Sequence, residues 1–149
     1  MRAIIQRVSS SSVTVDTQLV GKINKGFNVL LGVKIGDTEK DADYICDKIL
    51  GLRIFSDQDD KMNLSIQDIN GEILLISQFT LYADARKGKR PSFSSSAKFD
   101  DGKVLYEYTI NRLKNSGLTI EHGIYGADMK VLIANDGPVT IMLDSERQF

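Results

Sequence analysis

The chain has 149 residues, of which 42% are hydrophobic and 26% are charged. This length and composition are typical of one globular domain, residues 1–149, with a buried core. Lys and Arg number 19 against 20 Asp and Glu, and the net charge of −1 argues against a protein that coats nucleic acid with its whole surface. No apolar run approaches the roughly 20 residues of a membrane helix, and the N-terminus is a poor signal peptide. We therefore expect a cytoplasmic protein without a membrane partner.

The chain contains one cysteine, Cys46, and one histidine, His122. A single cysteine cannot form an internal disulfide, and the two residues together cannot build a Cys/His zinc site. A Ser-His-Asp triad would have to use His122, which nothing in its neighbourhood singles out from a structural histidine. The motifs of phosphate-binding loops, dinucleotide sites and zinc proteases are also missing. An enzyme with this sequence would have to work without the usual histidine base.

In chain order, the first 35 residues predict strands, because short β-branched runs alternate there with Ser, Asp, Asn or Gly. Residues 37–51 predict a helix that Asp37 or Thr38 can cap and that Gly51 ends. Cys46 falls on the apolar face of this helix, so we expect a buried core residue rather than a nucleophile.

The second half begins with a short strand and a polar loop, followed by a predicted hairpin that turns at Asn70-Gly71. A second helix is expected at about 100–115, capped by Asp100 or Asp101 and stopped by Gly117. Strands return in the last 32 residues. The order of elements predicts an α+β fold with a compact, mainly antiparallel, β-barrel-like sheet and two covering helices.

The stretch "LLISQFTLYAD", residues 74–84, loses its apolar character at Ser77, Gln78 and Thr80. If the strand continued, Gln78 and Thr80 would share one face, and Ser77 and Phe79 the other. The stretch is either a partly exposed strand end or a polar cluster whose hydroxyl, amide and free backbone N–H groups converge on a ligand.

Two further stretches are unusual. The loop "ARKGKRPSF" holds the densest positive cluster of the chain, which is either solvated charge or a patch for a substrate with phosphates, RNA included; its basic residues are Arg86, Lys87, Lys89 and Arg90. The stretch "NDGPVT" predicts a hairpin turn at Asn135-Asp136, but Pro138, which cannot donate to a sheet ladder, follows at once.

Residues 77–84, 86–93 and 135–140 together resemble the signature of the D-aminoacyl-tRNA deacylases. The stretches 2–16, 36–57, 61–81 and 125–140 resemble the same family in order and spacing, so the resemblance covers essentially the whole chain. It implies a homodimer of barrel-like domains that hydrolyses the ester between a D-amino acid and the terminal adenosine of tRNA. Such chirality proofreading would also clear glycine mischarged on tRNA, and it needs no metal or organic cofactor.

The resemblance also implies roles for particular residues. Backbone N–H groups around Phe79 and Thr80 would stabilise the oxyanion, and Ser77 and Gln78 would help to seat the adenosine and the ester. The neighbouring 2′-OH of the substrate could replace a histidine base.

In the same family the Gly137-Pro138 peptide is cis, reaches into the partner's pocket and excludes L side chains, and Arg7 resembles the residue that braces this loop. Exclusion by main chain would leave the site indifferent to the identity of the D side chain.

Two alternatives stay open. The chain could be a non-catalytic RNA-binding module that uses the basic loop and an exposed strand edge. The reaction could also use Thr80 as a covalent nucleophile, although a threonine hydroxyl needs a nearby base, and the sequence shows none.

Overall fold

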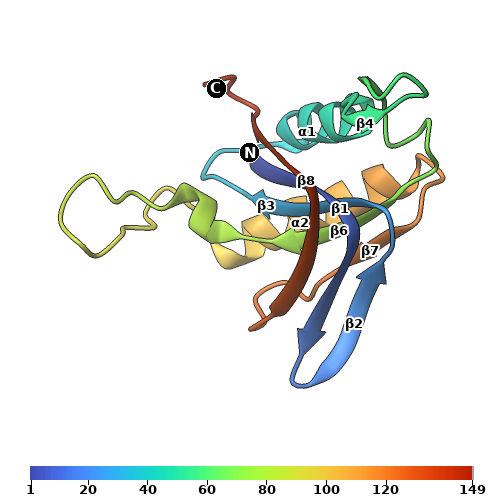
Figure 1. Cartoon of the computed structure of the whole chain (residues 1–149). Helices are drawn as coiled ribbons and strands as arrows, with labels where there is room; N and C mark the ends of the chain where they lie inside the picture. Colours follow the sequence, from blue (N-terminus) through green and yellow to red (C-terminus); the bar gives the residue numbers. More distant parts are fainter. Residues whose placement is uncertain (149) are drawn as a thin grey trace.

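The computed structural model describes residues 1–148 and has two α-helices, a short 3-10 helix and eight strands in that range (Figure 1). The helices are α1 (Glu39–Gly51) and α2 (Phe99–Lys114), and the 3-10 helix is η1 (Phe79–Tyr82). The strands are β1 (Arg2–Val15), β2 (Gln18–Ile23), β3 (Gly26–Gly32), β4 (Phe55–Ser56), β5 (Met62–Leu64), β6 (Glu72–Ser77), β7 (Ile120–His122) and β8 (Lys130–Asp144). Neither α-helix is long and apolar enough to cross a membrane.

The main sheet has the order β2-β1-β3-β6-β7, with β8 added along β1. β1 is antiparallel to β2, β3 and β8, whereas β6 is parallel to both β3 and β7. The sheet curls so far that β2 approaches β7. The two strands are so close that a Cβ atom on Gly21 would lie 3.2 Å from the carbonyl oxygen of His122. The predicted barrel-like α+β fold is confirmed, and its sheet is mixed.

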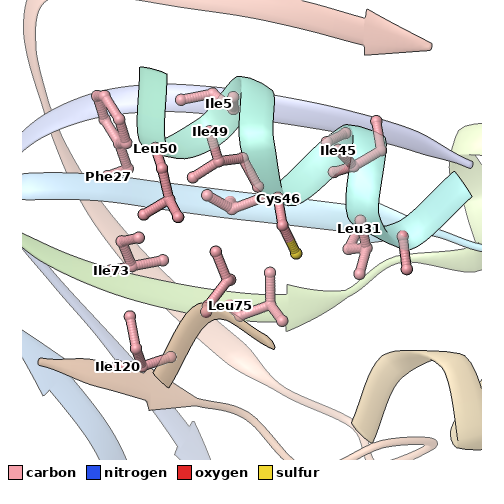
Figure 2. Close-up of a cluster of buried hydrophobic side chains, with 14 of the residues drawn as sticks. Ile5, Phe27, Leu31, Ile45, Cys46, Ile49, Leu50, Ile73, Leu75 and Ile120 are labelled. Atoms are coloured by element: carbon pink, nitrogen blue, oxygen red, sulfur yellow. The ribbon is translucent and has the colours of Figure 1, made fainter. Parts of the chain in front are cut away.

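Strand β6 is buried on both faces, which explains its continuous apolar run. Ile73 and Leu75 point into the core that the helices cover, and Leu74 and Ile76 point into a second core between the sheet and the outer strands. Figure 2 shows the α1 side chains that enter the first core opposite Leu31, Ile73 and Leu75. The packing of β6 on both faces therefore fixes the position of its last residue, Ser77, at the edge of the sheet.

Helix α1 follows the prediction closely. Thr38 is the N-cap residue, and its backbone N–H donates to Oδ2 of Asp41 at 2.8 Å. Cys46 is fully buried, and burial raises the pKa of its thiol to about 12. The predicted core role of Cys46 is confirmed, and its thiol is poorly suited to nucleophilic chemistry.

The predicted hairpin at Asn70-Gly71 is wrong. β5 pairs with β4, whereas β6 pairs with β3 and β7, so the chain makes a turn there without forming a hairpin. In this turn the Gly71 N–H donates to the carbonyl oxygen of Ile66 at 2.9 Å, and Asn70 has a φ of 48°. An Asn-Gly pair favours the left-handed backbone of such a turn, but β6 is buried on both faces as a central strand and pairs with β3 and β7 in parallel.

The predicted turn at Asn135-Asp136 is also wrong, because β8 runs on from Lys130 to Asp144 as one strand. Its register against β1 pairs Val8 with Asn135 and Gln6 with Thr140, so residues 136–139 lie opposite Arg7 alone. The extra residues form a bulge, which is one of the few places where a strand tolerates a proline. Residues 136–139 are called the β8 bulge below.

The boundaries of α2 also differ from the prediction. Its N-cap is Lys98 rather than Asp100 or Asp101, which lie in the first turn, and its last residue is Lys114, before the expected stop at Gly117. Acidic side chains in a first turn stabilise a helix through its dipole, so these residues mark the helix start without being the cap itself.

Candidate active site

The site starts where β6 ends. Ser77 is the last strand residue, and the backbone N–H of Gln78 donates to the carbonyl oxygen of Leu31 at 2.7 Å. The chain then coils into η1, so the strand alternation expected for residues 77–80 does not occur. Instead, Ser77, Gln78 and Phe79 all line one cavity.

The turn into η1 leaves two neighbouring backbone donors free. The first N–H groups of a helical turn have no acceptor inside that turn. Within residues 1–148 the N–H groups of Phe79 and Thr80 find no hydrogen-bond acceptor, and both residues are exposed. Two adjacent free N–H groups can bind one oxygen atom that carries developing negative charge.

The cavity next to this turn has a volume of about 500 Å³ and is mostly apolar and aromatic. One wall comes from the ends of β3 and β6, and the others come from α2 and from residues 125–131. The lining residues are Leu31, Val33, Ile76, Ser77, Gln78, Phe79, Ala97, Phe99, Tyr106, Tyr125, Gly126, Ala127, Asp128, Met129 and Val131. Such a wall suits a flat, aromatic ligand group with a few polar atoms.

Two glycines allow the aromatic wall to close. A Cβ atom on Gly102 would lie 2.2 Å from the hydroxyl of Tyr125, and one on Gly126 would lie 2.4 Å from the ring of Phe99. Gly126 also has a φ of 77°, which favours glycine. The Phe99 and Tyr125 rings then meet edge to face at 5.2 Å, and the Tyr106 ring lies 5.5 Å from Tyr125. Sequence reasoning did not identify this wall, because its members are far apart in the chain and form no local motif.

Thr80 lies outside the cavity lining, and its side chain is exposed. Its hydroxyl accepts a hydrogen bond from the side-chain amide of Gln78. An amide N–H group can donate a proton but cannot remove one from the hydroxyl. The structure thus gives Thr80 no general base among its hydrogen-bond partners in residues 1–148.

His122 is not part of the cavity either. It lies in β7, and its Nδ1 is 2.9 Å from the carbonyl oxygen of Gly123. No group of three or more His, Cys, Asp or Glu side chains in the described part of the chain is arranged to hold a metal ion. Among the cavity-lining residues, Asp128 is the only carboxylate.

The β8 bulge carries the Gly137-Pro138 peptide, which is cis. Arg7 connects the bulge to the segment before β4. Its Nε donates to the carbonyl oxygen of Asp136 at 3.2 Å, and its Nη1 donates to the carbonyl oxygen of Ile54 at 2.7 Å. Gly137 and Pro138 are exposed and do not line the cavity. The chain on its own therefore leaves the bulge and the cavity as separate features.

The basic loop, residues 85–91, extends away from the rest of the molecule as the yellow-green segment in Figure 1. Two backbone hydrogen bonds between Asp84 and Ser92, 2.7 and 2.9 Å long, close its base. Arg86 forms an ion pair with Asp84 at 2.7 Å, and its hydrogen bonds lower the pKa of that carboxyl group. Among the described residues no ion-pair partner is found for Lys87, Lys89 or Arg90, so three of the four predicted cations remain available to a ligand.

The sequence matches the model of a family described as D-Tyr-tRNA(Tyr) deacylase over residues 4–144, which is nearly the whole chain. The chain belongs to this family. A relative from Clostridium beijerinckii (strain ATCC 51743 / NCIMB 8052), named D-aminoacyl-tRNA deacylase, is 59% identical over 149 residues, which is 100% of both chains. The resemblance noted in the sequence is confirmed, and the chain is a hydrolase that acts on the ester bond of aminoacyl-tRNA.

Two solved structures share the fold of this chain. One, described as c-Myc DNA Unwinding Element Binding Protein, is 39% identical, has a TM-score of 0.91 and covers 97% of this chain and 98% of its own. Another, described as a probable eukaryotic D-amino acid tRNA deacylase, has a TM-score of 0.81 at 16% identity and covers 95% of this chain and 97% of its own. At that identity the second structure supports the fold of the deacylase and nothing further.

Proposed function

We propose that this deacylase removes D-amino acids, and glycine, from mischarged tRNA, and that a second copy of the chain completes each site. The observation that carries the proposal is the pair of free N–H groups at Phe79 and Thr80 beside an aromatic cavity. An esterase of this kind needs donors for an oxyanion and a seat for the group that bears the ester.

In the proposed reaction the terminal adenosine of the tRNA occupies the cavity, with Ser77 and Gln78 near the ester. A water molecule attacks the carbonyl carbon, the carbonyl oxygen gains negative charge, and the N–H groups of Phe79 and Thr80 stabilise it. The bond from carbonyl carbon to ribose oxygen then breaks, and that oxygen takes a proton. The substrate's neighbouring 2′-OH assists the proton transfer, which is consistent with the position of His122 outside the cavity.

Chirality is selected by exclusion in this proposal. Main-chain carbonyl groups of Gly137 and Pro138 from the partner subunit would face the substrate's α-amino group. With the amino group and ester fixed, a D side chain points away, and an L side chain meets backbone atoms. Glycine has no side chain to exclude, so glycyl-tRNA is also a substrate.

The exposed, non-lining position of Gly137 and Pro138 supports completion by a second copy. The same strand exposes two large apolar side chains, since Leu132 is 71% and Met142 is 55% accessible. Apolar side chains in that position are typical of a surface that another chain covers.

We further propose that the loop cations Arg86, Lys87, Lys89 and Arg90 contact phosphates of the tRNA. Charged tRNA is used in the cytoplasm, so we expect the enzyme there.

The test compares D-tyrosyl-tRNA, L-tyrosyl-tRNA and glycyl-tRNA at one enzyme concentration, with release of the amino acid followed against an enzyme-free control. We expect fast loss of the D and glycine esters and no loss of the L ester above the control. Binding of all three tRNAs without ester loss would instead support a non-catalytic RNA-binding module.

A further inference from the structure

Ser96 lies directly behind the turn that carries the two free donors. Its hydroxyl donates a hydrogen bond to the carbonyl oxygen of Phe79 at 3.0 Å. The residues between them, 80–95, include the rest of η1 and the whole basic loop, so this contact spans 17 positions of the chain. No local pattern in the sequence predicts it.

The acceptor of this bond shares a peptide unit with one of the donors. The carbonyl group of Phe79 and the N–H group of Thr80 belong to the same planar, trans peptide, in which the C=O and N–H bonds point in opposite directions. A group that fixes the direction of the Phe79 oxygen therefore also fixes the direction of the Thr80 N–H. Ser96 holds the far side of this peptide unit, away from the oxygen that the N–H would bind.

Ser96 can hold the turn because the backbone on both sides of it is anchored. The N–H of Ile35 donates to the carbonyl oxygen of Ser95 at 3.1 Å, and the N–H of Ala97 donates to that of Val33 at 2.9 Å. These bonds attach residues 95–97 to the segment that follows β3. Strand β3 pairs with β6 in parallel, so residues 95–97 and the turn after β6 are both held in place by the same sheet.

The other donor does not depend on Ser96. The N–H of Phe79 shares its peptide unit with the carbonyl group of Gln78, which accepts a bond from the N–H of Leu81 at 3.3 Å. That bond lies within the turn. The i→i+3 pattern of η1 also uses the Phe79 carbonyl group, so Ser96 adds a second hold on that group alone. Loss of the Ser96 hydroxyl should therefore loosen the Thr80 donor and leave the Phe79 donor in place.

We propose that Ser96 is a positioning residue that orients the Thr80 N–H toward the oxyanion of the deacylation reaction; this inference rests on the proposed function above. Ser96 touches neither substrate nor reacting atoms. It acts through the peptide unit of Phe79 and Thr80, and its contribution appears when the carbonyl oxygen gains charge. Its removal should lower kcat and leave KM nearly unchanged, because ground-state binding in the aromatic cavity does not use this donor.

The experiment compares wild type with Ser96→Ala, Ser96→Thr and a neighbouring control, Ser95→Ala, by steady-state kinetics on D-tyrosyl-tRNA. Ser95 is exposed, and its hydroxyl makes no hydrogen bond with the described residues. For Ser96→Ala we expect kcat to fall about fivefold, well below the 10²–10³ of a lost oxyanion donor, since the donor stays present but less well oriented. Ser96→Thr should restore most of kcat, and Ser95→Ala should match wild type.

A kcat for Ser96→Ala equal to wild type, or a change confined to KM, would overturn the inference. The inference would also be overturned if kcat fell equally in Ser96→Ala and Ser96→Thr while both variants melted at the wild-type temperature. If Ser96→Ala proves unstable, the comparison of Ser96→Thr with wild type decides, because a retained hydroxyl should retain kcat. Failure of the proposed function would look different, since wild-type enzyme itself would then release no D-tyrosine.

Discussion

At the scale of single residues, the role of Thr80 separates two mechanisms. Its hydroxyl accepts a hydrogen bond from the Gln78 amide, and no base is among its partners in residues 1–148. We predict that Thr80→Ala keeps kcat on D-tyrosyl-tRNA within about fivefold of wild type, because one lost neutral hydrogen bond is worth about 1 kcal/mol. The backbone N–H of residue 80 remains in the variant.

Single-turnover kinetics on D-tyrosyl-tRNA provides the measurement, with Thr80→Ser as the control that keeps the hydroxyl. A covalent nucleophile would instead lose several orders of magnitude in rate on removal of its oxygen. Such a loss in Thr80→Ala, with full activity in Thr80→Ser, would contradict a site built from backbone donors alone.

Residue-level reasoning from the sequence found the polar segment but not its surroundings. The interruption of an apolar run marked Ser77, Gln78 and Thr80, of which Ser77 and Gln78 line the cavity and Thr80 does not. The opposite wall, which includes Phe99 and Tyr125, depends on contacts between α2 and the segment before β8. Aromatic residues at such distances in the chain give no periodic signal, so only the fold reveals them.

At the scale of elements, the local turn rules were right about the backbone conformation of one predicted turn and wrong about strand pairing at both. Asn70 adopts the left-handed backbone that an Asn-Gly pair favours, yet β6 joins parallel partners. At the second predicted turn the positive φ, 119°, falls on Gly137 rather than on Asn135 or Asp136, and the segment forms the β8 bulge rather than a hairpin tip. Turn chemistry is local, whereas the choice of a strand partner depends on which faces can be buried.

Arg7 links the β8 bulge to the carbonyl oxygen of Ile54. We predict that Arg7→Met, which keeps the apolar stem, lowers the ratio of D- to L-tyrosyl-tRNA rates by about tenfold, or 1.4 kcal/mol of discrimination. The bulge would then lose its brace but keep its sequence, so an L substrate would meet a less rigid barrier. The two rates should be measured well below the melting temperature.

Arg112→Met is the matched control, because Arg112 also joins two segments of the chain, here the two helices, through ion pairs with Asp43 and Asp47. Arg112→Met should lower the free energy of unfolding without changing the ratio of D- to L-tyrosyl-tRNA rates. An unchanged ratio in Arg7→Met would show that the bulge keeps its shape without the guanidinium group.

At the scale of the whole molecule, the exposed apolar side chains of β8 suggest a second copy of the chain. Leu132 and Met142 lie on either side of the bulge, so a chain that covers both of them also covers Gly137 and Pro138. We predict that the protein sediments at twice its chain mass of 16.6 kDa. The double variant Leu132→Glu, Met142→Glu should sediment as a monomer, because like charges would face each other in a symmetric interface.

The same double variant links assembly to activity. If Gly137 and Pro138 complete the partner's site, the monomer should lose its discrimination between D- and L-tyrosyl-tRNA together with most of its activity. Val104→Glu is a suitable control, since Val104 is 64% exposed on α2 and lies outside β8. A monomeric double variant with wild-type rate and selectivity would refute completion of the site by a partner, and a dimeric one would shift the interface to another face of the molecule.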